Sequence, residues 1–214
     1  MSPTLAKTKK TDKAEAMRAI HDELLMLTDS PLYTYRTENS FLPVVGDGNP
    51  DAHIMFVGEA PGRNEAKTGK PFCGAAGKIL DELLASVGVD RASVYVTNIV
   101  KDRPPENRDP TPEEIVIYGP YLDRQIDIIE PEVIVTLGRY AMIYIMKKFG
   151  LETEIETIGQ AHGKVYHAHT AQTKGARKLD IVTLYHPCAA IYDRAKLPML
   201  KTDFQILKKY EKTK

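Results

Sequence analysis

Ile54-Met55-Phe56-Val57-Gly58-Glu59-Ala60-Pro61-Gly62 is the stretch of sequence that decides the fold of this chain. Its apolar beginning predicts a short buried strand over 53–57, and the glycine, acid and Pro-Gly pair that follow predict a tight turn. In an open α/β sheet, ligands bind at the carboxyl ends of the strands. The turn therefore predicts a binding site that contains the carboxylate of Glu59 and free backbone N–H groups.

The segment Gly69-Lys70-Pro71-Phe72-Cys73-Gly74-Ala75-Ala76-Gly77 places one aromatic ring on a glycine-rich turn. A phenylalanine considered alone is more often a core residue. Phe72, however, stands between a proline and a run of small residues, and a flat ring held in this way is a surface on which a flat ligand can stack. We interpret Phe72 as a stacking platform.

Strand-like and helix-like segments alternate along the rest of the chain. The spacing of apolar residues predicts further strands over 93–97, 133–137, 164–169 and 179–184, and helices over 14–27, 74–87, 112–129, 139–149 and 198–212. Such alternation is typical of a parallel sheet with helices on both faces. The sequence thus predicts an α/β fold, a three-layer α/β/α sandwich with a short, mainly parallel four-stranded central sheet.

Composition limits the remaining possibilities. The chain has 214 residues, of which 43% are hydrophobic, and no apolar run long enough to span a membrane, so a single soluble domain over residues 14–214 is expected. Residues 1–13 are polar and lysine-rich, without the apolar region of a secretory signal, and are predicted to be a disordered basic tail. The formal net charge is zero, so nucleic-acid binding would require a local basic patch. The two cysteines cannot form a disulfide framework, which favours a reducing cytoplasm.

Three of the predicted strands end in residues that can carry chemistry. Glu59 follows the first strand, Asn98 ends the second, and His186-Pro187 follows the last. Each could be a simple turn residue, but the ends of parallel strands lie on one edge of the sheet, so the three can converge. A carboxylate can hold water or stabilise a cation, an amide can read a base edge, and a histidine can donate a hydrogen bond to developing negative charge.

Several motifs resemble those of one enzyme family. They are Gly58-Glu59-Ala60-Pro61-Gly62, the segment 69–77, Val94-Tyr95-Val96-Thr97-Asn98-Ile99-Val100-Lys101, Arg103-Pro104-Pro105-Glu106-Asn107-Arg108 and Tyr185-His186-Pro187. In this order and spacing the chain resembles the uracil-DNA glycosylase superfamily, most closely its family 4, over 31–203. The resemblance implies that 14–214 is one glycosylase-like domain.

The resemblance also implies a mechanism. Uracil is flipped out of DNA, contacts Gly58 and Ala60, stacks on Phe72 and is read by Asn98, which rejects cytosine. Glu59 positions water and stabilises an oxocarbenium-like sugar, and His186 hydrogen-bonds the departing uracil anion.

The DNA duplex is expected to contact two further segments. In the proline-rich loop the candidates for phosphate contacts are Lys101, Arg103 and Arg108. The segment after His186 would lie in the minor groove and wedge the gap left by the flipped base, with Pro187, Ala189 and Arg194 as its contact residues.

The chain departs from family 4 at the positions of an iron–sulfur cluster. The resemblance places the four cluster cysteines of that family at Leu27, Ser30, Asp102 and Tyr118, none of which is cysteine here. We therefore predict no cluster, and no other cofactor or metal. Side-chain packing is expected to hold the two loops instead, with Leu27, Tyr33, Tyr35 and Tyr118 as candidates.

The sequence thus predicts a monofunctional, monomeric DNA glycosylase that acts on uracil in single- or double-stranded DNA, in the cytoplasm and without a membrane partner. Two alternatives remain open. One is a non-catalytic protein that binds uracil or damaged bases in DNA, and the other is a glycosylase for another deaminated base, such as hypoxanthine or xanthine.

Overall fold

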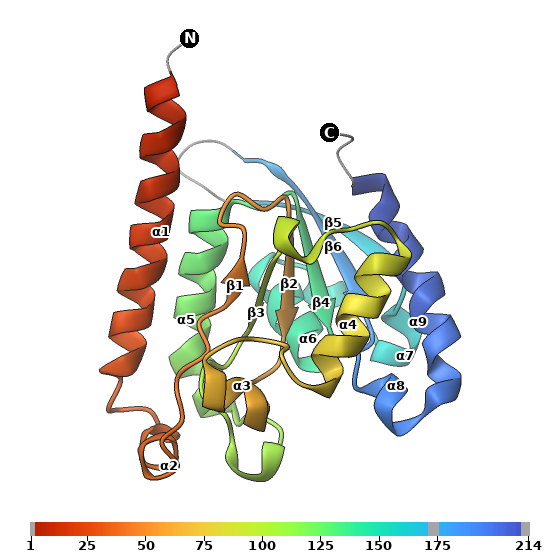
Figure 1. Cartoon of the computed structure of the whole chain (residues 1–214). Helices are drawn as coiled ribbons and strands as arrows, with labels where there is room; N and C mark the ends of the chain where they lie inside the picture. The colour runs from red at the N-terminus through yellow and green to blue at the C-terminus, as the bar shows by residue number, and fades with distance from the viewer. Residues whose placement is uncertain (1–2, 171–175, 211–214) are drawn as a thin grey trace.

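A six-stranded sheet forms the centre of the computed structural model, which describes residues 3–170 and 176–210 (Figure 1). The strand order is β1-β3-β2-β4-β6-β5. The four central strands are parallel, and the two edge strands are antiparallel to their neighbours. Their bounds are β1 (Asp47–Gly48), β2 (Ile54–Gly58), β3 (Tyr95–Asn98), β4 (Val133–Leu137), β5 (Lys164–His169) and β6 (Lys178–Leu184).

The sheet is therefore wider than the predicted four strands. The parallel centre agrees with the prediction, and the difference lies at the edges. β1 has only two residues, Asp47 and Gly48, which are turn formers rather than strand formers, so it forms because Val96 and Tyr95 of β3 offer backbone partners. β5 pairs with β6 and alternates buried and exposed side chains, as expected of an edge strand with one covered face.

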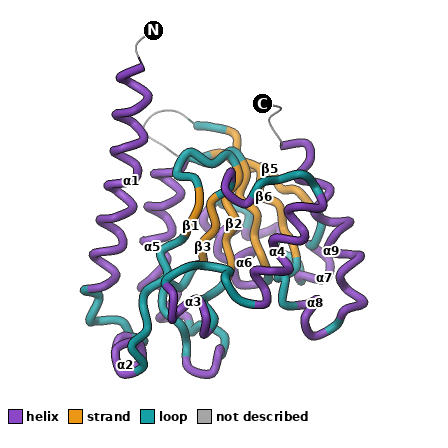
Figure 2. The backbone as a smooth tube through the Cα atoms, in the orientation of Figure 1, coloured by secondary structure: helices purple, strands orange, loops and turns teal. Residues whose placement is uncertain are grey.

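Helices cover both faces of the sheet and make the predicted three layers (Figures 1 and 2). One apolar cluster joins the sheet to α4 (Ala75–Ser86) and α9 (Leu197–Phe204), and a second joins the opposite face to α5 (Pro112–Ile129) and α6 (Arg139–Lys148). The short elements are α2 (Tyr33–Glu38), α3 (Arg63–Thr68), α7 (Ile158–Ala161), α8 (Ala189–Tyr192), η1 (Arg91–Ser93), η2 (Pro105–Asn107), η3 (Glu152–Glu154), η4 (Arg194–Lys196) and η5 (Gln205–Tyr210).

The N-terminal helix is longer than predicted. Helix α1 runs from Pro3 to Leu25, so most of the segment expected to be a disordered tail lies within its first turns. Proline is well suited to the first turn of a helix, and the residues that follow contain no glycine and several lysines and alanines, which favour helix. Ile20 and Leu24 of α1 pack on α5 through Tyr118 and form a third apolar cluster outside the three layers. None of the described helices is long and apolar enough to cross a membrane.

Helix α5 begins as its sequence predicts. Thr111 is the N-cap, its side chain accepts from the Glu114 N–H (3.2 Å), and the Glu114 carboxylate accepts from the Thr111 N–H (2.9 Å). This reciprocal capping fixes the point at which the proline-rich loop ends and the helix starts.

Candidate active site

The carboxyl ends of the parallel strands border a cavity of about 580 Å³. In Figure 1 this edge lies at the bottom of the sheet, where α3 and α8 also lie. Glu59, Phe72, Asn98 and His186 all line the cavity, so the structure brings together the four residues on which the sequence interpretation depends. The other lining residues include Ala60, Arg63, Pro104, Arg108, Asp109, Arg139, Tyr185, Ala189 and Tyr192.

Gly58 is the point of closest approach between two walls of the cavity. It ends β2 and pairs with Asn98 at the end of β3. A Cβ atom at Gly58 would lie 2.4 Å from Asn98 Oδ1 and 2.9 Å from Phe72 Cζ. Glycine is therefore required here, because any side chain would displace the amide or the ring.

Phe72 is held in a backbone conformation that few residues adopt. Its φ is +50°, in the left-handed region, and its ring is 8% exposed. Glu65 Oε1 accepts from the Gly74 N–H at 2.8 Å and so holds the turn. Gly77 allows the turn to close tightly, because a Cβ there would lie 1.7 Å from the Phe72 carbonyl oxygen. The ring centroid is 5.5 Å from that of His186, so the two rings form adjoining walls.

Asn98 presents an amide that has no protein partner. Its side chain is 2% exposed, lines the cavity and makes no hydrogen bond with any described residue. The amide faces the cavity and not the closed core, so it is available to a ligand that offers both a donor and an acceptor.

Lys101 lies behind Asn98 in the protein interior and does not contact DNA. Its side chain is fully buried, and Nζ donates to the Asn98 carbonyl oxygen (2.7 Å), Thr97 Oγ1 (2.8 Å) and Gln125 Oε1 (2.6 Å). Burial without a carboxylate partner holds the pKa of the Lys101 amine well below its usual range. The sequence-based assignment to phosphate was wrong, because it could not show that the residue turns back under the strand it follows.

Glu59 is a carboxyl group close to its titration point at neutral pH. Burial is the largest effect and raises its pKa to about 7, the negative charge of Asp109 adds to this, and Arg139 opposes it. Asp109 itself accepts from Arg139 Nη2 (2.5 Å) and from Tyr140 Oη (2.8 Å). Asp109 and Arg139 were not singled out from sequence, because neither belongs to a recognisable motif.

His186 is a neutral imidazole with a defined tautomer. Burial lowers its pKa to about 4. The backbone N–H of Cys188 donates to Nδ1 at 3.2 Å, so Nδ1 carries a lone pair and the proton is on Nε2. Gly138, whose φ is +92°, allows this close packing, since a Cβ there would lie 3.3 Å from the His186 Cβ. The site thus contains a neutral N–H donor at the cavity wall.

The remaining predicted DNA contacts divide into buried and exposed residues. Arg103 is 9% exposed and donates to Tyr35 Oη and Asn107 Oδ1, both at 2.8 Å, so it is a structural residue and that assignment was also wrong. Arg108 lines the cavity but is paired with Glu114 at 2.6 Å. After His186, Pro187 is buried, Ala189 lines the cavity and Arg194 is exposed.

Two residues at the cavity mouth were missed. Arg63 begins α3, is exposed, and forms no ion pair with the described residues. Tyr192 ends α8, lines the cavity, and is 88% exposed, the most exposed of the large hydrophobic side chains that the structure describes. A bulky aromatic residue so close to His186-Pro187 was a usable signal for a candidate DNA contact, whereas nothing in the sequence distinguishes Arg63 from other surface arginines.

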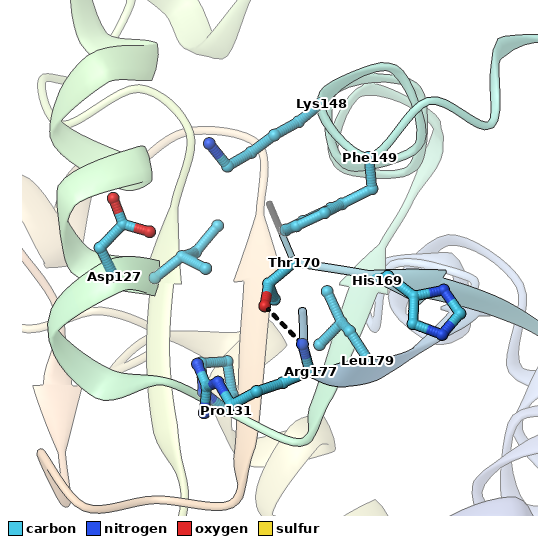
Figure 3. A pocket seen from close by; sticks show the side chains of 9 residues that line it. Asp127, Pro131, Lys148, Phe149, His169, Thr170, Arg177 and Leu179 are labelled. Atoms are coloured by element: carbon cyan, nitrogen blue, oxygen red, sulfur yellow. Dashed lines mark hydrogen bonds between the residues drawn. The ribbon is translucent and has the colours of Figure 1, made fainter. Parts of the chain in front are cut away.

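A second, smaller cavity of about 210 Å³ is lined by Pro131, which precedes β4, and Arg177, which precedes β6, and so lies at the amino ends of the parallel strands. Figure 3 shows its lining side chains. Its charged groups are already engaged: Lys148 pairs with Asp123 (3.0 Å), and Arg177 donates to the Glu130 carbonyl oxygen (3.2 Å). Throughout the described ranges, no three His, Cys, Asp or Glu side chains are grouped so that they could hold a metal ion. The first cavity is therefore the candidate active site.

The chain is similar to known proteins over most of its length. The model of the uracil DNA glycosylase superfamily matches residues 45–210. The type-4 uracil-DNA glycosylase of Archaeoglobus fulgidus is 46% identical over 171 residues, which cover 80% of each chain. That of Sulfurisphaera tokodaii is 42% identical over 192 residues, 89% of this chain and 83% of the relative. The type-5 uracil-DNA glycosylase of Thermus thermophilus is 36% identical over 124 residues, 51% of this chain and 56% of the relative.

Proposed function

Since this chain belongs to the uracil-DNA glycosylase superfamily, we propose that it excises uracil from DNA by hydrolysing the N-glycosidic bond and leaves an abasic site. The observation that carries the proposal is the convergence of Glu59, Phe72, Asn98 and His186 on one cavity of about 580 Å³. A cavity of that size lies within the usual range for small-molecule sites.

Recognition requires uracil to leave the base stack and enter the cavity. The ring stacks on Phe72 between the walls formed by Gly58 and Ala60. The Asn98 amide oxygen accepts from uracil N3–H, and the amide nitrogen donates to O4, so both halves of the unpartnered amide are satisfied. Cytosine presents an acceptor at N3 and a donor at C4, which leaves both halves of the amide opposed. Tyr192 is the side chain that fills the gap in the DNA.

The chemistry divides between two groups. His186 donates its Nε2–H to the oxygen on which charge develops as uracil departs, and it does so as a neutral imidazole. Glu59 in its ionised form holds the attacking water and stabilises positive charge on the sugar. These roles need only positioning and electrostatics, so we propose that the reaction uses no metal and no cofactor.

We propose that the enzyme acts as a monomer, because Glu59, Phe72, Asn98 and His186 of a single chain already line one cavity together. The free thiols of Cys73 and Cys188 suit a reducing compartment, for which we propose the cytoplasm.

The test is a glycosylase assay with oligonucleotides that contain uracil, hypoxanthine, xanthine or cytosine at one position, in single- and double-stranded form. We expect abasic sites from uracil, with kcat lowered about a hundredfold or more in Glu59→Gln and His186→Ala. Glu113→Gln, which changes an exposed glutamate on α5, is the matched control for Glu59→Gln and should retain full activity.

Two outcomes of this assay would contradict the proposal. Uracil-dependent retention of DNA without any abasic product would indicate a binding protein. Faster release of hypoxanthine or xanthine than of uracil would indicate a glycosylase for another deaminated base.

A further inference from the structure

A buried polar network connects the N-terminal helices to the loop that borders the active site. The Arg36 guanidinium lies 3.1 Å from Asp102 Oδ2, and Tyr118 Oη donates to the same oxygen at 2.6 Å. Ser30 Oγ lies 2.6 Å from Tyr118 Oη and serves as its donor, because the tyrosine proton is given to Asp102. All four side chains are at most 5% exposed.

The network satisfies each of its polar groups. Arg36 also donates to the carbonyl oxygens of Leu24 (2.7 Å) and Leu25 (2.9 Å), which end α1, and Ser30 Oγ accepts from the Leu32 N–H (3.1 Å). Burial raises the pKa of the Asp102 carboxyl, and Tyr118 and Arg36 oppose that shift. A buried charge that is both paired and hydrogen-bonded is tolerated, whereas the loss of one partner leaves the other uncompensated.

Three members of the network, Ser30, Asp102 and Tyr118, stand at positions that the family resemblance assigns to the ligands of an iron–sulfur cluster. The fourth such position is Leu27. Thiolates hold such clusters, and these positions offer an alkyl group, a hydroxyl, a carboxylate and a phenol. The oxygens of Ser30, Tyr118 and Asp102 bond directly to one another at 2.6 Å. The residues do not fit a cluster.

The predicted substitute, side-chain packing, was only partly right. Leu27 does pack against the third apolar cluster, which contains the buried Tyr118. The hydroxyl of Tyr118 is nevertheless the centre of a polar network, and Tyr35 contributes through its hydroxyl, which accepts from Arg103 at 2.8 Å.

The position of Asp102 explains what the network can do. Asp102 is the residue before Arg103, and from there the chain runs through Pro104 to Asn107 and Arg108, which line the mouth of the catalytic cavity. Arg103 continues the attachment through Tyr35 and Asn107. The start of this loop is thus fixed from two sides, by α1 and α2 through Arg36 and by α5 through Tyr118.

We propose that the Arg36–Asp102–Tyr118–Ser30 network is a metal-free tether that positions the loop 102–108 for DNA binding, in place of an iron–sulfur cluster. This inference rests on the proposed function, because the loop matters only if DNA lies against the cavity. Arg36, Asp102, Tyr118 and Ser30 are positioning residues, since none of them lines the cavity.

The test compares Tyr118→Phe and Asp102→Asn with Tyr121→Phe. Tyr121 lies on the same helix, and its hydroxyl has no hydrogen bond within the part of the chain that the structure describes, so its removal takes away one oxygen without touching the network. We expect KM for uracil-containing DNA to rise roughly tenfold in the two network variants, with kcat at saturating DNA within about twofold. Tyr121→Phe should match the parent protein.

Should a single variant fail to fold, an apolar exchange of the whole ion pair keeps the proposal testable. Arg36→Met combined with Asp102→Leu leaves no uncompensated charge, so it should fold and unfold at a higher temperature than either single change. We expect it still to show the raised KM, because the loop has lost its polar attachment. An unchanged KM in this double variant and in Tyr118→Phe would overturn the tether.

A metal analysis of the parent protein is the second part of the test. The parent protein, purified without exposure to oxygen, should contain iron and acid-labile sulfide at far below one atom per chain. A brown protein with stoichiometric iron and sulfide would overturn the metal-free tether. Failure of the tether can be distinguished from failure of the proposed function. If the parent protein releases no uracil, its metal content and the unfolding temperatures of the variants can still be measured.

Discussion

At the scale of single residues, the site combines two titratable groups whose pKa values are shifted in opposite directions. Burial favours the neutral form of both, which raises the pKa of Glu59 to about 7 and lowers that of His186 to about 4. His186 is thus a neutral donor at every pH above about 4, while Glu59 must lose a proton to act. The identities of these residues could be predicted from their places at strand ends, but their charge states could not, because burial, which only the folded chain shows, is the largest cause of both pKa shifts.

This difference predicts the pH dependence of the reaction. As the pH rises through about 7, Glu59 ionises, so kcat/KM on uracil-containing DNA should rise by about tenfold per pH unit below that value and then level off. Glu59→Gln should remove this limb as well as most of the activity. A flat profile between pH 5 and 8 in the parent enzyme would contradict the assigned state of Glu59, as would a limb that survives in the glutamine variant.

At the scale of elements, the ends of β2 and β3 and the loops after them determine the site. Sequence analysis placed Gly58 and Asn98 at these ends, because strand length and turn residues are local properties. It misassigned Lys101, because a lysine at the start of a loop that contains prolines and arginines has the composition of a phosphate-binding segment. Only the tertiary structure shows that its amine is enclosed by Thr97, Asn98 and Gln125.

A buried structural role and a DNA-contact role can be separated experimentally by comparing a variant of Lys101 with a variant of Arg63. Lys101→Met leaves buried acceptors without a donor and should lower the free energy of unfolding by about 1–3 kcal/mol, while the slope of DNA affinity against salt concentration is retained. Arg63→Gln should do the reverse. Its unfolding temperature should be unchanged, its DNA binding should be weaker, and the slope of log affinity against log salt concentration should be smaller by about one. Urea unfolding and binding titrations at several salt concentrations measure both. If the Lys101→Met protein is stable and its DNA affinity depends less steeply on salt concentration, then Lys101 contacts DNA and the structural role is wrong.

At the scale of the whole molecule, the fold gathers residues from opposite ends of the chain onto one edge of a parallel sheet. Glu59 and His186 are far apart in sequence, and the parallel register of β2, β3, β4 and β6 brings them to the same cavity. This convergence was predictable, because parallel strands end on one edge. The two-residue edge strand β1 and the buried Arg36–Asp102 pair were not, since each depends on partners that only the folded chain supplies.

The central claim is that this cavity hydrolyses the bond between uracil and DNA. Its most direct test is a single-turnover reaction in which free uracil and abasic sites are counted together by mass spectrometry. The account predicts one uracil released for each abasic site formed with the parent enzyme, none from a matched strand with cytosine, and a strongly reduced yield with Asn98→Ala. Bound DNA without released uracil, or undiminished release by Asn98→Ala, would contradict it.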